Sequence, residues 1–521
     1  MNTGTVIFNA YPDSIGTRLS DTVNLLKRPE LKSAFSLFYV LPTFFNSDLD
    51  RGFSIIDYNL NKELVSRKDL KDLRALKIDL KLDLVLNHLS VNSPQFRDLL
   101  NRGDQSEYID FFIDWNKFWQ GRGTIDREGC IIPHSRHLDA LFMRKPELPV
   151  MKVRFPDGSD RFFWNTFYRD ISYEDEKPRY LGQIDLNARS EKVWAFYDQT
   201  LAQLQNHGAK IVRLDAFAYL HKEPGRQNFF NRPETWTYLD RLNKMARRYG
   251  LIILPEIHAE YGSGLHQAIA SKGYPVYDFF FPGLVIDALE RGTSENLLAW
   301  IREIEEKGIE TINMLGCHDG IPVLDLRGKE VEGDYKPGLL SSQQIEDLIN
   351  LIMARGGRTK NLYGPGGEKI SYYQVNATFF SALGEDERKL RMARAIQLFM
   401  PGIPQVWYLD LFAGKNDYQA ADQAGSAGHK EINRTNLSLN EVENGLKKSI
   451  VQDQLAMIRL RNTSPAFYGR LEVDTGSAPH MLQLVRRHDG CRATLSANLR
   501  DFTLRIEHKN RSGQDEVLTY S

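Results

Sequence analysis

Charged and polar residues stand inside, or directly after, several of the most apolar runs of this sequence. Ile211–Phe217 is such a run, and it holds Arg213 and Asp215 two positions apart. In a strand, residues two apart point to the same face, so these two side chains would lie together. Burying them costs free energy, which indicates either a structural ion pair at a strand end or a functional site. Other apolar runs end in Asn87-His88, Glu256-Ile257-His258 and His318-Asp319.

Each of these residues has an ordinary explanation when it is taken alone. His88 could be a satisfied core histidine, and Glu256 could form an ion pair at the rim of a sheet. Three carboxylates that converge on one rim without metal-ligand spacing are harder to explain in that way. Carboxylates held close together push their pKa values apart, so that one can act as an acid while another stays ionised.

The chemistry that such a set supports is glycosyl transfer. In a retaining mechanism one carboxylate attacks the anomeric carbon, and a second, protonated one about 5 to 5.5 Å away donates to the leaving oxygen. A third carboxylate can stabilise the oxocarbenium-like transition state. Histidines and an arginine can hold the sugar hydroxyls and keep the nucleophile ionised.

Bringing these residues together requires parallel strands whose ends share one rim. Short apolar runs alternate with segments of helical period, which favours a parallel sheet with right-handed crossovers. Eight candidate strands are the number that closes a (β/α)8 barrel, in which the chemistry lies at the strand ends. An open doubly wound sheet normally has a Gly-rich phosphate loop after its first strand, and residues 11–16 do not form one. The predicted strands are Val6–Tyr11, Ser36–Leu41, Asp83–His88, Ile211–Phe217, Leu251–His258, Val276–Phe281, Thr311–Asp319 and Ile403–Leu409, and the predicted helices include Arg67–Leu76, Glu191–Gln205, Pro233–Arg248, Ser294–Lys307 and Asp386–Leu398.

Two stretches between these elements are too long for ordinary barrel loops and are therefore predicted to be insertions. Residues 89–190, rich in aromatics, Arg and Gly, are predicted to form a small inserted domain, domain B. Residues 322–385, with a Gly-rich centre, are predicted to form a lid region. Short alternating strands after about residue 470 predict a compact β domain over 470–521. The α/β barrel itself then comprises residues 1–88, 191–321 and 386–469.

Composition narrows the kind of protein. The chain has 42% apolar and 26% charged residues and a formal net charge of -1, so neither nucleic acid nor an anionic membrane is favoured as a partner. The three cysteines are widely scattered, which favours a reducing compartment. The first residues lack the features of a signal peptide, and no run approaches the roughly 18 apolar residues of a membrane span. We therefore expect a cytoplasmic enzyme, with its oligomeric state left open.

At the candidate residues the chain resembles the α-amylase superfamily, glycoside hydrolase family 13. Four of its motifs occur in order: Asp83-Leu-Val-Leu-Asn-His88, Val212-Arg-Leu-Asp-Ala216, Leu254-Pro-Glu-Ile-His258 and Leu315-Gly-Cys-His-Asp319. The resemblance narrows to the sucrose phosphorylase branch through Asp50-Arg-Gly-Phe53, Met314–Pro322, Tyr373-Gln-Val-Asn376, Ala395–Tyr408, Phe412–Asp417 and Glu431-Ile-Asn-Arg434.

The resemblance implies a role for each matching residue. Asp215 would be the nucleophile, Glu256 the general acid/base and Asp319 the transition-state stabiliser. No metal or cofactor is implied; inorganic phosphate would be a co-substrate. The glucosyl unit would be bound by Asp50, His88, Arg213, His318 and Arg434 between the aromatic walls of Phe53 and Phe167, and the acceptor would be contacted by Gln183, Tyr219, His258 and Gln374.

A phosphorylase must also attract a phosphate dianion and keep water out. The candidates are Arg144 and Lys145, either of which can match the family's phosphate-binding Arg, together with Tyr373. A solvated pair of loop charges is the alternative explanation of the two basic residues. Tyr373 resembles the sucrose-using members, because those that take sucrose 6-phosphate tend to have a His there.

The predicted function is a retaining glucoside phosphorylase that converts an α-glucoside, such as sucrose, and phosphate into α-D-glucose 1-phosphate and a free acceptor. The alternative is an α-glucosidase or transglucosidase that uses water or a sugar, and a third hypothesis is a non-catalytic carbohydrate-binding protein. The chain departs from the branch at 169–182, 220–228 and 359–371, near the acceptor side. Fructose, fructose 6-phosphate, glycerol and glycerate therefore all stay open as the acceptor.

Overall fold

The computed structural model describes residues 5–139, 141, 144, 147–174, 177–363, 369–424, 428–473, 478–509 and 513–520, and the side chains of 171–174, 177–179, 360–363 and 369–373 are left out of this description. Its centre is an eight-stranded parallel sheet with the order β14-β13-β5-β2-β1-β21-β16-β15. The two outer strands of this order, β14 and β15, are consecutive in the chain, as expected of a sheet that curls into a (β/α)8 barrel. The strands are β1 (Ile7–Ala10), β2 (Leu37–Val40), β5 (Asp79–Val85), β13 (Ala209–Asp215), β14 (Ile252–Pro255), β15 (Val276–Asp278), β16 (Thr311–Met314) and β21 (Ile403–Trp407).

The barrel confirms the predicted fold class, but all eight strands end earlier than the apolar runs suggested, four of them by three residues or more. β14 ends at Pro255 and β16 ends at Met314, so Glu256 and Asp319 lie on the loops that follow and not on the strands. β15 ends at Asp278, and β5 ends at Val85, with His88–Ser90 forming a separate short strand, β6. The paired register of β14 with β13 ends at Pro255 opposite Leu214, and one further hydrogen bond, from the Glu256 N–H to the Leu214 carbonyl at 3.3 Å, ties the start of the loop to β13.

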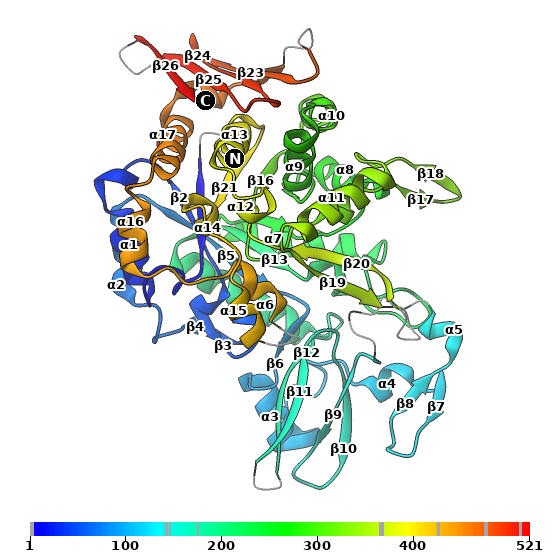
Figure 1. Ribbon diagram of the computed structural model, residues 1–521. Helices are drawn as coiled ribbons and strands as arrows, with labels where there is room; N and C mark the ends of the chain where they lie inside the picture. The colour runs from blue at the N-terminus through cyan, green and yellow to red at the C-terminus, as the bar shows by residue number, and fades with distance from the viewer. Residues whose placement is uncertain are drawn as a thin grey trace.

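Helices surround the barrel, as Figure 1 shows. Their starts carry helix-capping residues where the sequence provides them: the Ser66 side chain accepts from the backbone N–H of Asp69 at the start of α2. The five predicted helices are confirmed to within two residues at each end. The helices are α1 (Leu19–Leu26), α2 (Arg67–Ala75), α6 (Glu191–His207), α7 (Glu234–Arg248), α8 (Leu265–Ser271), α9 (Phe281–Arg291), α10 (Glu295–Lys307), α12 (Phe379–Ala382), α13 (Glu387–Phe399), α14 (Tyr408–Leu411), α15 (Tyr418–Gln423), α16 (Leu439–Gly445) and α17 (Ser449–Thr463).

The long segment between β5 and α6 contributes antiparallel strands and short helices that lie away from the barrel core in Figure 1. Trp115, Trp119 and Trp164 are buried together there, in a cluster separate from the main core. A hydrophobic cluster of its own is what an inserted folding unit requires. Its elements are α3 (Pro94–Arg102), α4 (Trp115–Trp119), α5 (Ser135–Leu138), β7 (Gly123–Ile125), β8 (Ile131–Pro133), β9 (Val150–Arg154), β10 (Asp160–Trp164), β11 (Arg169–Glu174) and β12 (Lys177–Asp185).

The stretch predicted as a lid contains a hairpin, a helix and a second hairpin. These are β17 (Lys329–Val331) with β18 (Asp334–Lys336), α11 (Ser342–Ala354), and β19 (Arg358–Tyr363) with β20 (Lys369–Asn376). Between β2 and α2, β3 (Phe45–Ser47) pairs with β4 (Ile55–Leu60) in an antiparallel hairpin.

An antiparallel sheet ends the chain and lies at the top of Figure 1, on the far side of the barrel from the insertion. It contains β22 (Leu471–Val473), β23 (Met481–His488), β24 (Cys491–Asn498), β25 (Leu504–Lys509) and β26 (Asp515–Tyr520) in sequence order. Exact domain boundaries stay a prediction. Within the described part of the chain, none of the helices has the length and apolar character that a membrane crossing needs.

Candidate active site

A pocket of about 310 Å³ opens where the barrel strands end. Asp215 ends β13, whereas Glu256 and Asp319 come from the loops after β14 and β16. The pocket is therefore at the carboxyl ends of the strands, where barrel enzymes place their chemistry. Twelve of the predicted site residues line it: Asp50, Phe53, His88, Arg144, Phe167, Gln183, Asp215, Tyr219, Glu256, His258, His318 and Asp319.

Arg213 connects the carboxylates beneath the pocket. Its Nη1 donates to Asp83 at 2.7 Å and to Asp215 at 2.9 Å, while its Nη2 lies 2.6 Å from Glu256. The Arg213 side chain is 1% exposed. A buried guanidinium with three carboxylate partners is satisfied electrostatically, and its planar fork fixes where those carboxylates stand.

The backbone after Asp215 also reaches Glu256. Ala216 has a left-handed conformation, with φ of 52°, which is uncommon for a residue other than Gly. In this conformation its N–H donates to Glu256 Oε2 at 3.3 Å. A strained residue between a strand-end carboxylate and a second carboxylate is the kind of backbone outlier that occurs at active sites.

Asp215 and Asp319 have opposite electrostatic environments. Burial, reinforced by the charges of Glu256 and Asp83, raises the pKa of Asp215 well above its usual value, although Arg213 opposes the shift. Burial acts in the same direction on Asp319, but the charges of Lys430, His318 and Arg434 hold its pKa well below the usual value. Asp319 is therefore a fixed negative charge, whereas Asp215 ionises only at a higher pH than a carboxyl group in water.

Lys430, which was not predicted from the sequence, is the nearest cation to Asp319 among the residues that the structure describes. Its Nζ lies 2.5 Å from Asp319 Oδ1, and its side chain lines the pocket. The residue directly precedes the Glu431–Arg434 motif, so that motif could have pointed to it. Arg434 lies behind the pocket wall, where its Nε donates to the backbone carbonyl of His318 at 2.8 Å.

Aromatic rings form two walls of the pocket. Phe53 stacks on His318 with ring centroids 5.1 Å apart, and Phe167 packs against His88 at 5.1 Å and Tyr219 at 5.3 Å. The His88 ring is also within hydrogen-bond distance of the Phe53 backbone carbonyl, at 3.1 Å. Such rings give a sugar apolar faces to lie on between polar groups.

These features can be compared with known proteins. Residues 33–269 match the model of the alpha amylase catalytic domain. The chain is 59% identical to a sucrose 6(F)-phosphate phosphorylase of Ilumatobacter coccineus over 99% of this chain and 97% of that protein. It is 32% identical to a sucrose phosphorylase of Streptococcus mutans, over 96% of this chain and 97% of that protein.

The chain belongs to glycoside hydrolase family 13, in the sucrose phosphorylase-like branch. A solved relative in this branch, the sucrose 6F-phosphate phosphorylase from Thermoanaerobacter thermosaccharolyticum, superimposes with a TM-score of 0.86 at 31% identity. That comparison covers 99% of this chain and 98% of the other. The likeness extends over the insertions as well as the barrel.

Several residues that the family resemblance pointed to do not reach the pocket surface. Arg213 and Arg434 are buried behind the residues that line the pocket. Gln374, on β20, is 2% exposed and donates to Asn376 at 3.0 Å, so in this structure it does not line the pocket. Lys145 and the side chain of Tyr373 lie outside the described residues.

Arg144 is the predicted phosphate ligand that the structure describes. Its Nη1 donates to the Tyr219 hydroxyl at 3.3 Å, and its guanidinium lies 5.5 Å from the centre of the Phe167 ring. The charge thus reaches the pocket wall beside the aromatic rings. This is a suitable position for a cation that meets an incoming anion.

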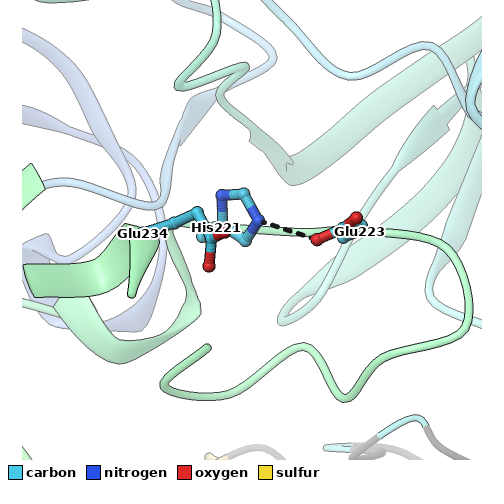
Figure 2. A group of neighbouring side chains, drawn as sticks. All are labelled: His221, Glu223 and Glu234. Carbon is cyan, nitrogen blue, oxygen red and sulfur yellow. Dashed lines mark ion pairs between the residues drawn. The ribbon is translucent and has the colours of Figure 1, made fainter. Parts of the chain in front are cut away.

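Two groups of described residues have carboxylate and imidazole atoms close enough to be potential metal ligands. Glu256, His258 and Asp319 have potential ligand atoms within 4.8 Å of one another, but Arg213 and Lys430 already pair with the two carboxylates. The second group is His221, Glu223 and Glu234, shown in Figure 2. There Arg226 Nη1 lies 3.0 Å from Glu223 and 3.5 Å from Glu234, so the arginine forms ion pairs with both carboxylates of this group.

The sequence analysis did not single out several other residues that line the pocket. Tyr168, Gln227 and Phe229 come from the inserted segment and from the loop after β13. A further group lines the outer part of the pocket and comes from two adjoining loops: Ala259, Glu260, Leu324, Asp325, Arg327 and Lys329. Their spacing in the sequence gave no signal of a common site.

Proposed function

We propose that this glucoside phosphorylase acts by double displacement on a sucrose 6F-phosphate-like donor, with Asp215 as nucleophile, Glu256 as general acid/base and Asp319 as transition-state stabiliser. The products would be α-D-glucose 1-phosphate and fructose 6-phosphate. The observation that carries the proposal is the contact of one buried guanidinium, Arg213, with both Asp215 and Glu256. The relative that is 59% identical over almost the whole chain supports the choice of donor.

Two steps follow from this arrangement. In the first, Glu256 gives its proton to the glycosidic oxygen while Asp215 bonds to the anomeric carbon and the acceptor sugar leaves. In the second, a phosphate oxygen bonds to the same carbon, its proton returns to Glu256, and Asp215 departs as a carboxylate. Asp319, held ionised by Lys430, faces the positive charge that develops on the sugar ring in both steps.

The proposal needs phosphate as co-substrate and no metal or organic cofactor. The three cysteines of the chain are widely scattered, which suits a reducing compartment, and on that ground we place the enzyme in the cytoplasm.

The test is the product formed with and without phosphate. We expect phosphate-dependent release of glucose 1-phosphate, with a higher kcat/KM for sucrose 6F-phosphate than for sucrose. Release of free glucose at the same rate without phosphate would instead favour the α-glucosidase or transglucosidase hypothesis. A preference for unphosphorylated sucrose would agree with the resemblance of Tyr373 to sucrose-using members and would contradict the proposed donor.

Glu256→Gln should lower kcat by about 10²–10⁴-fold with a sugar leaving group, because the leaving oxygen can no longer be protonated. An activated donor such as α-glucosyl fluoride needs little acid assistance, so its glucosylation step should be affected much less. Measuring both donors separates the two effects. An equal loss on both would mean that Glu256 does not act as the acid.

Arg144→Ala should raise the KM for phosphate by about tenfold or more while changing the KM for the donor little, because a charge-assisted contact to the incoming anion is lost. Initial rates over a matrix of donor and phosphate concentrations give both constants. Arg97→Ala, on α3 of the same insertion, removes the same charge away from the pocket and is the control. Equal changes in both constants would contradict a phosphate role.

The pH dependence should reflect the carboxylates that surround Arg213. The nucleophile must be ionised, and the pKa of Asp215 is raised by burial and by Glu256 and Asp83, so kcat/KM should fall as the pH falls through this raised pKa. Asp83→Asn removes one negative neighbour and leaves Arg213 free to face Asp215. The pH at which kcat/KM falls to half of its maximum on the acid side should therefore be lower in the variant, whatever the value of that maximum. An unchanged half-maximal pH would show that another group controls this fall in kcat/KM.

A further inference from the structure

Two loops that are far apart in the sequence meet along the outer wall of the pocket in a row of charged pairs. His258 Nδ1 lies 3.0 Å from Asp325 Oδ2. One step outward, Glu260 contacts Arg327 at 2.8 Å and Lys329 at 3.0 Å. All five residues line the pocket.

This row leads outward from the general acid. His258 Nε2 lies 3.6 Å from Glu256, so the inner pair of the row touches the group that protonates the leaving oxygen. Glu260 follows His258 by two residues on the same loop. The cations beside Glu260 therefore stand on the leaving-group side of the pocket.

The charges at the outer end do not cancel. One carboxylate, Glu260, is shared by two cations, which leaves an excess of one positive charge. Although partial burial opposes the shift, the hydrogen bonds and charges of Arg327 and Lys329 lower the pKa of Glu260 to about 2. Glu260 thus stays ionised and holds both cations at the pocket, where the Arg327 and Lys329 side chains are 41% and 46% exposed.

Joining the two loops does not require both of the cations that contact Glu260. The two loops are already joined by their backbones, because the N–H of Gly262 donates to the carbonyl of Arg327 at 3.2 Å. They approach so closely that a Cβ on Gly262 would stand 2.3 Å from the backbone nitrogen of Lys329. The second cation is therefore more than the loop contact requires, and its placement in the pocket calls for another explanation.

We propose that Arg327 and Lys329 bind the phosphate monoester of the leaving sugar, with Glu260 holding the two cations in place. This anion site differs from the one that Arg144 offers to inorganic phosphate. Arg144 follows α5 in the insertion, whereas Lys329 begins β17 of the β17–β18 hairpin beside α8 and α11 (Figure 1), and Arg327 lies two residues before it. The inference rests on the proposed function, because it requires a donor whose leaving group carries a phosphate.

The experiment compares a phosphorylated donor with its unphosphorylated counterpart. The double variant Arg327→Gln/Lys329→Gln should lose about 100-fold in kcat/KM for sucrose 6F-phosphate, because two charge-assisted contacts are removed. Its kcat/KM for sucrose should stay within about threefold of the unaltered enzyme, and so should the KM for phosphate measured with sucrose. Lys329→Gln alone keeps the Arg327–Glu260 pair and should lose about tenfold on the phosphorylated donor only.

Lys336→Ala is the matched control, because Lys336 lies on β18 of the same hairpin and does not line the pocket. Equal losses on both donors in the single and double variants would mean that Arg327 and Lys329 only anchor the hairpin, and would overturn the inference. An unchanged preference for the phosphorylated donor would overturn it as well, while leaving the proposed function intact. If the unaltered enzyme itself shows no preference for sucrose 6F-phosphate, both the proposed donor and this site are wrong.

Discussion

Asp215→Asn is expected to lower turnover by about 10⁴-fold or more, because the amide cannot form the glucosyl ester through which both half-reactions pass. Asn has almost the same shape and can still accept from Arg213, so the fold should be preserved. Release of glucose 1-phosphate from saturating donor and phosphate gives the loss in kcat. An unchanged thermal unfolding midpoint excludes misfolding as its cause.

Trapping the intermediate makes this prediction sharper. A 2-deoxy-2-fluoro-α-glucosyl fluoride should slow the second half-reaction and leave the unaltered enzyme heavier by one fluoroglucosyl unit. Peptide mapping of the unaltered enzyme should place the label on Asp215. The Asp215→Asn protein should gain no mass under the same conditions. Appreciable turnover by the variant, or a label on another carboxylate, would remove Asp215 from the nucleophile's role.

Arg213→Gln is expected to produce a loss of both stability and activity. Asp83, Asp215 and Glu256 would be left without their shared cation, and removing one partner from a buried charged group typically costs about 3–5 kcal/mol. Denaturant-induced unfolding at neutral pH measures this change. Because the remaining carboxylates repel one another, the deficit should shrink at acid pH, where protonation removes their charges.

The matched control for Arg213 is an arginine that forms an ion pair on the surface. Arg248, at the end of α7, lies 2.6 Å from Asp198, and the two side chains are 58% and 32% exposed. Arg248→Gln should change the free energy of unfolding by no more than about 1 kcal/mol and leave kcat unchanged. A similarly small effect at Arg213 would mean that the carboxylates hold their positions without it.

Much of the barrel could be predicted from local sequence. Apolar runs of strand length alternate with amphipathic segments such as Glu295–Lys307, and this alternation specifies a parallel sheet covered by helices. The pairing of Arg213 with Asp215 could also be predicted, since residues two apart in a strand share a face. These features depend on neighbours in the chain, which the sequence shows directly.

The position of the other two carboxylates was decided by the tertiary structure. The apolar runs continue through Glu256 and to Asp319, yet the paired register of β14 with β13 ends at Pro255 and that of β16 with β21 ends at Met314, so both carboxylates lie on loops. The contact of Lys430 with Asp319 joins residues 111 positions apart, and no local pattern specifies it. The Glu260–Arg327–Lys329 group arises in the same way, from two loops that only the closed barrel brings together. The residue types and their order thus determined the family and its chemistry, whereas long-range packing decided which charges meet at the pocket.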